Sequence, residues 1–80
     1  MHELGVLRQI VKTVSRITEE NRITRVRHIA LDVGESSSFV PMYLEKLFPV
    51  AADACPPLRK AELRISVVPG AGLVIKEIGY

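Results

Sequence analysis

The sequence has 80 residues, a net charge of +2 and a single cysteine, Cys55, which indicates one small domain without an internal disulfide. Hydrophobic residues make up 48% of the chain and charged residues 25%, a balance that is typical of a globular protein and excludes intrinsic disorder. No apolar run approaches the roughly 20 residues that cross a bilayer. His2, Glu3 and Arg8 stand where a signal peptide requires a continuous apolar stretch, so we expect a cytoplasmic protein.

The first predicted element is an amphipathic helix over about residues 3–21. Its apolar residues recur at the spacing of one helical face, with charged residues on the far side. Asn21 is expected to end this helix, because β-branched residues follow it. The residues expected to form the buried stripe are Leu4, Leu7, Ile10, Val11, Val14 and Ile17.

A strand and a second helix are predicted next, separated by the polar loop 35–38. Residues 25–34 alternate between apolar and polar side chains, which is typical of a strand with one buried face. Pro41 suits the first turn of a helix, whereas Pro49 removes a hydrogen bond inside it, so we expect a kink there. The buried residues are expected to be Ile29, Leu31 and Val33 in the strand and Leu44, Leu47, Phe48 and Ala51 in the helix.

Two strands complete the chain, over residues 61–68 and 73–80. The four residues 69–72 between them include two glycines and a proline, which predicts an antiparallel hairpin. The order α-β-α-β-β predicts an α+β domain with two helices packed on one face of a small three-stranded sheet.

The other face of this sheet is expected to be exposed and partly apolar. Such a patch in a small domain favours a partner or self-association surface, and an unpaired edge strand gives a second route to a homodimer. Alternation assigns to this face His28, Ala30, Asp32, Arg64, Ser66, Val68, Val74, Lys76 and Ile78.

Four short motifs lead to a family. In chain order they are Met1-His2-Glu3-Leu4, Asp32-Val33-Gly34-Glu35, Val40-Pro41-x-x-Leu44 and Ala61-Glu62-Leu63. Together they resemble, over essentially the whole chain, the hydrogenase and urease nickel-insertion accessory proteins of the HypA/HybF type. The resemblance implies a Ni(II)-binding metallochaperone domain. It also implies partners: a maturation GTPase of the nickel enzyme, the [NiFe] hydrogenase precursor, or both.

One departure from that family is large. Its members carry a zinc module with two CxxC pairs between the last two strands, whereas this chain has no CxxC. We therefore expect a single nickel-binding-type domain over residues 1–80, with the zinc module absent between Val68 and Leu73, and we expect no zinc.

The start of the chain offers nickel ligands, namely Met1, His2 and Glu3. Ni(II) favours nitrogen-rich sites, and the Met1 amine, the His2 and Glu3 amides and the His2 imidazole lie within three residues. The first four N–H groups of a helix have no intrahelical acceptor, so a metal can displace their protons without breaking a backbone hydrogen bond. Two roles stay open for the Glu3 carboxylate, which either stabilises the positive helix end or orients the His2 ring.

Structural interpretations compete with these functional ones. A His-Glu pair at a helix start is more often a solvated end than a metal site, and only the resemblance favours the ligand. His28 is expected to be a surface residue and Cys55 a small buried hydrophobe. The cluster of Arg22, Arg25 and Arg27 is either a solvated edge or a docking site for an acidic partner.

The sequence contains no catalytic constellation, so we expect no enzyme. Two tyrosines and two phenylalanines are too few for a base-stacking surface, so we expect no nucleic acid among the partners. Because no apolar run is long enough to cross a bilayer, we expect no membrane either. Two functions remain: a nickel metallochaperone domain, or a metal-free protein-interaction or dimerisation module of the same fold.

Overall fold

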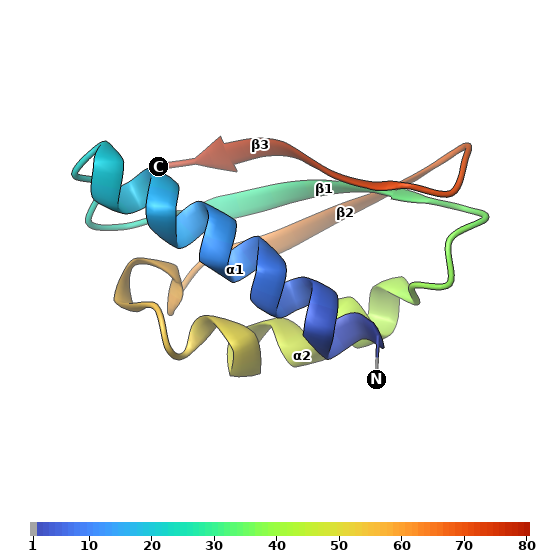
Figure 1. Cartoon of the computed structure of the whole chain (residues 1–80), viewed down its shortest axis with the longest axis horizontal. Coiled ribbons are helices and arrows are strands. Elements are labelled where there is room, and N and C mark those ends of the chain that lie inside the picture. The colour runs from blue at the N-terminus through green and yellow to red at the C-terminus, as the bar shows by residue number, and fades with distance from the viewer. Residues whose placement is uncertain (1) are drawn as a thin grey trace.

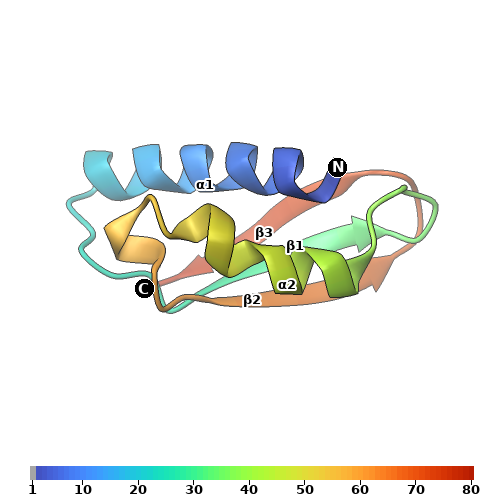
Figure 2. The same ribbon diagram turned by 90° about the horizontal axis from the view of Figure 1, so that it is seen from below.

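The computed structural model describes residues 2–80, with the backbone alone for His2, and has two helices on one face of a three-stranded sheet (Figures 1 and 2). This confirms the predicted α+β class and the order α-β-α-β-β, to which a short 3₁₀ helix is added. The elements are α1 (His2–Glu20), β1 (His28–Gly34), α2 (Pro41–Ala52), η1 (Pro56–Leu58), β2 (Glu62–Val68) and β3 (Leu73–Gly79).

The sheet has the order β2-β1-β3, with β2 parallel and β3 antiparallel to the central β1. The predicted hairpin of the last two strands is therefore wrong, because β2 and β3 lie at opposite edges. The helical crossover α2 makes β2 parallel to β1, and β3 then pairs with the other edge of β1. In this arrangement β1 lies at the centre of the sheet, and its inward side chains are fully buried.

The connection from β2 to β3 passes over the end of β1 and is bonded to it. Gly34 donates from its N–H to the carbonyl of Gly72 at 2.7 Å, and Ser36 donates to the carbonyl of Gly70 at 2.8 Å. A Cβ on Gly34 would lie 2.3 Å from the Gly70 carbonyl oxygen. Only glycine fits this close approach of two backbones.

The core lies between the helices and the inward face of the sheet, largely as the apolar spacing predicts. Leu44, Phe48 and Ala51 are buried in α2 as expected, and Leu47 is half-buried. Val67 pairs with the inward Val33 but is 60% exposed, so the core does not cover this part of β2. The fully buried large side chains are Leu7, Val14, Val26, Ile29, Leu31, Val33, Leu44 and Leu58.

One register shift reverses the prediction for the end of β3. Ala30 pairs with Glu77 and Leu31 with Ile75, so β3 has an extra residue at this point, the signature of a β-bulge. Beyond it Ile78 pairs with Ile29 and packs against the core instead of facing outward. Simple alternation fails here because a one-residue insertion moves every following side chain to the other face.

The helix ends differ in detail from the prediction. α1 ends in a Schellman motif, in which the N–H of Ile23 donates to the Thr18 carbonyl at 2.8 Å and Arg22 has a positive φ of 55°. This motif, more than Asn21, ends the helix. α2 continues through Pro49 to Ala52 as one helix.

Candidate metal site at the start of the chain

The two helices begin at the same end of the molecule, next to each other (Figures 1 and 2). Glu3, in the first turn of α1, is only 9% exposed, and its Oε2 accepts a hydrogen bond from the backbone N–H of Val40 at 3.1 Å. Val40 is the N-cap residue of α2, and its side chain makes no capping hydrogen bond. The carboxylate of Glu3 thus ties the start of α1 to the start of α2.

This contact replaces a local one that α2 lacks. In a capping box, an acidic residue at the third helical position reaches back to the N–H of the N-cap. Position three of α2 is Tyr43, and the first turn of α2 has no acidic residue. Glu3 supplies the acceptor from another helix and places its negative charge at the positive end of α2. This role of Glu3 could not be predicted from the sequence, because the two residues are 37 positions apart.

The other two predicted ligands are described only in part. Met1 and the side chain of His2 lie outside the described residues. α1 begins at His2, so the amides of His2 and Glu3 belong to the first turn, where N–H groups have no intrahelical acceptor.

Elsewhere in the described residues no group of three or more histidine, cysteine, aspartate or glutamate side chains could hold a metal. Nε2 of His28 lies 2.8 Å from Oε2 of Glu77 on the outward face of the sheet. The hydrogen bond from His28, with the charge of its ring, holds the pKa of the Glu77 carboxyl below its ordinary value of 4.5. His28 also covers Gly79, where a Cβ would lie 2.0 Å from the ring. This pair links β1 to β3. His28 lies on the outward face as predicted, but its side chain is only 15% exposed.

The structure also gives the burial of the single cysteine and of the arginine cluster that the sequence analysis considered. Cys55 is 5% exposed and free, so it is the small buried hydrophobe that was expected. Arg22, Arg25 and Arg27 are all exposed.

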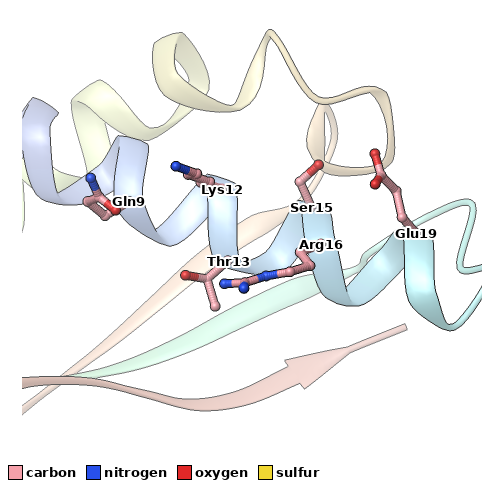
Figure 3. A pocket seen from close by; sticks show the side chains of 6 residues that line it. All are labelled: Gln9, Lys12, Thr13, Ser15, Arg16 and Glu19. Atoms are coloured by element: carbon pink, nitrogen blue, oxygen red, sulfur yellow. The ribbon is translucent and has the colours of Figure 1, made fainter.

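A polar hollow lies along the outer side of α1 (Figure 3). All of its lining residues belong to this one helix, so no second element encloses it or shields it from water. The lining residues are Gln9, Lys12, Thr13, Ser15, Arg16 and Glu19. In the part of the chain that the structure describes, no helix is both long and apolar enough to cross a membrane.

Comparison with known proteins gives the family. The sequence model described as hydrogenase/urease nickel incorporation, metallochaperone, hypA matches residues 1–73. The hydrogenase maturation factor HypA of Deinococcus radiodurans is 33% identical over 72 residues, and that of Trichodesmium erythraeum is 35% identical over 72 residues. Each alignment covers 90% of this chain but only 59% and 60% of the two relatives, so the chain spans about three fifths of their length.

Two solved structures share the fold. The solution structure of the Ni metallochaperone HypA from Helicobacter pylori superposes with a TM-score of 0.76 at 12% identity, covering 94% of this chain and 70% of that one. A second solution structure of a HypA protein gives a TM-score of 0.73 at 14% identity, covering 96% and 71%. The family model and the two curated relatives therefore show that the chain belongs to the HypA family, as its motifs predict.

Proposed function

We propose that this domain binds Ni(II) at Met1, His2 and Glu3 and delivers it during maturation of a [NiFe] hydrogenase or a urease. The observation that carries the proposal is the family match, which begins at residue 1 and so includes the Met-His-Glu start. A helix that begins at His2 is consistent with it, because the amides of the first turn have no intrahelical acceptor.

The proposed ligands are nitrogen atoms. They are the amine of Met1, the amides of His2 and Glu3, and the imidazole of His2. Amine, amides and imidazole must each lose or lack a proton to bind, so nickel binding releases protons and weakens as the pH falls.

Glu3 is proposed to act through its backbone amide as a ligand and through its carboxylate as a positioning group. The hydrogen bond from Val40 fixes the carboxylate at the start of α2. Glu3→Gln retains an oxygen that accepts this bond, so its nickel affinity should stay within a few fold of the parent. Glu3→Ala should weaken nickel binding more, because the first turn of α1 loses its attachment. Equal and large losses in both variants would instead indicate that the carboxylate is itself a ligand.

Metal analysis tests whether the domain holds nickel without zinc. The four-residue connection between Val68 and Leu73 contains no cysteine or histidine, so we propose that the domain holds no zinc. The purified protein, loaded with nickel and passed through a desalting column, should contain about one nickel and no zinc per chain. Stoichiometric zinc would contradict this proposal.

We further propose that the domain works in the cytoplasm with the nickel-enzyme maturation GTPase, the hydrogenase precursor, or both. Immobilised protein incubated with each purified candidate tests this directly. Retention of neither candidate, with nickel absent or present, would contradict the proposed partners.

The alternative, a metal-free interaction or dimerisation module, is favoured by one observation. Met42 and Tyr43, in the first turn of α2, are 60% and 52% exposed. In a module of this kind, His2→Ala should leave binding to the partner, or dimerisation measured by sedimentation, unchanged, whereas Met42→Ser should weaken it. In a metallochaperone, His2→Ala should abolish nickel binding, whereas Met42→Ser should leave nickel binding unchanged.

A further inference from the structure

A groove runs between α1 and the second half of α2, away from the start of the chain. Four of its lining residues belong to α1, two to α2 and two to the turn that follows α2. The lining residues are Arg8, Val11, Lys12 and Ser15 on one side and Val50, Ala51, Ala54 and Cys55 on the other.

The floor of the groove is apolar and the α2 rim is also apolar. Val11, Ala51 and Cys55 are 8%, 8% and 5% exposed, so only their outermost atoms reach the groove. Val50, by contrast, is 62% exposed on the rim. An exposed valine beside a shallow apolar floor gives a partner apolar surface to bury.

The α1 rim is positively charged and its charges are not neutralised. Arg8 and Lys12 are one helical turn apart and so lie on the same side of α1. Figure 3 shows Lys12 on the side of α1 that faces α2, whereas Arg16 lies toward the sheet. The ion pairs among the described residues involve neither Arg8 nor Lys12, and no acidic side chain lines the groove.

We propose that this groove binds an acidic amphipathic helix of a partner protein. The apolar face of such a helix would cover Val11 and Ala51, with its carboxylates beside Arg8 and Lys12. Helix-in-groove recognition uses this combination of an apolar stripe and flanking charges, and complementary charge gives it specificity and a faster association. The groove lies apart from the proposed nickel ligands, so its occupant is recognised independently of the metal.

A second copy of this chain does not have the complementary chemistry. The α1 rim carries Arg8 and Lys12, which would repel the same residues of another copy. In α2 the one acidic residue, Glu45, is followed by Lys46. The charge pattern therefore favours a different protein.

A fluorescein-labelled peptide tests the proposal by polarisation. The probe is a helical peptide of about 18 residues, long enough to form a helix, with leucine on one face and glutamate on the flanks. A twin with lysine in place of every glutamate is the matched control. The acidic peptide should bind the full-length domain at least about tenfold more tightly than its lysine twin.

Three variants then locate the binding. The double variant Arg8→Glu/Lys12→Glu should bind the acidic peptide about tenfold more weakly. Val50→Glu, on the opposite rim, should weaken it to a similar extent. Arg16→Glu reverses one charge on the same helix outside the groove, half of the change in the double variant, and should stay within about twofold. All four substituted positions are exposed, and circular dichroism will verify that each variant folds.

Several results would overturn the proposal. Equal binding of the acidic and lysine peptides would exclude charge recognition. If Arg16→Glu lost as much affinity for the acidic peptide as the double variant, the binding would depend on the overall charge of α1 and not on the groove. Binding to phosphatidylserine vesicles that the same rim substitutions abolish, with no binding of the peptide, would assign the surface to a membrane. Nickel binding should be unchanged in all of these variants, so a failure here leaves the nickel proposal intact.

Discussion

Replacing Glu3 with alanine should destabilise the whole domain, although Glu3 lies at the third position of the chain. The side chain is 9% exposed, and it accepts the N–H of Val40 at the start of a second helix. The substitution leaves that N–H without its carboxylate partner and removes a negative charge from the positive ends of two helices.

The magnitude follows from these two losses. A hydrogen bond to a charged group contributes about 1.5–3 kcal/mol net, and an acidic residue at a helix N-terminus contributes about 0.3–1 kcal/mol. Because the two effects share one carboxylate, we expect a loss of about 2 kcal/mol in the free energy of unfolding. In a domain of this size that corresponds to a decrease in Tm of roughly 8–16 °C. Glu3→Gln should lose about half as much, because its amide oxygen still accepts the bond.

Urea unfolding followed by circular dichroism measures these differences. Glu19→Ala is the matched control, because it removes a carboxylate from an exposed position of the same helix. It should change the free energy of unfolding by no more than about 0.5 kcal/mol. A Glu3→Ala variant as stable as Glu19→Ala would refute the role of Glu3 as the cap of α2.

Three further predictions use other positions. Gly34→Ala should lose about 2–3 kcal/mol in urea unfolding, because its Cβ would lie 2.3 Å from the Gly70 backbone oxygen; an unchanged midpoint would contradict this packing. Gly5→Ala, an exposed helical position with nothing within 4 Å of the new Cβ, should instead raise the free energy of unfolding by about 0.5–1 kcal/mol. His28 lowers the pKa of Glu77 from 4.5 in the folded state, so the folded chain binds fewer protons in that interval. The contribution of Glu77 to stability is then complete above pH 4.5 and is lost as the pH falls through the lower, folded-state pKa. The difference in unfolding free energy between the parent and Glu77→Gln should accordingly shrink as the pH falls below 4.5, and a difference that grows on acidification would contradict the sign.

The sequence predicts the parts of the fold that depend on local periodicity. The spacing of Leu7, Val14 and their neighbours predicts the first helix, and the alternation of Ile29, Leu31 and Val33 predicts the buried face of the central strand. These patterns are periodic over many residues, so single exceptions do not obscure them.

What the sequence does not predict depends on pairing between distant residues. Residues 69–72 have the composition of a hairpin turn, yet they join the two outer strands, because the strand order is set by contacts with β1. The bulge in β3 is also a property of the pair of strands, and it turns Ile78 inward. The outward face is consequently more polar than alternation predicts, with Glu77 beside His28.

The candidate site also has a part that the sequence indicates and a part that it does not. The Met-His-Glu motif is local, so the sequence alone indicates the proposed nitrogen donors at Met1 and His2. The hydrogen bond between Glu3 and Val40 joins two helix starts, and no local pattern encodes it. The groove between α1 and α2 was missed for the same reason, although the spacing of Arg8 and Lys12 on one helix face was a signal that could have indicated its charged rim.

A calorimetric titration of Ni(II) into tag-free protein that begins at Met1 tests the central claim most directly. The chain has two histidines, so His28→Ala is the matched control for His2→Ala. The proposed site predicts one tight nickel ion bound with release of protons, retained in His28→Ala and lost in His2→Ala and in a protein with one residue added before Met1. Undiminished affinity in His2→Ala or in the extended protein would contradict a nickel site at the start of the chain.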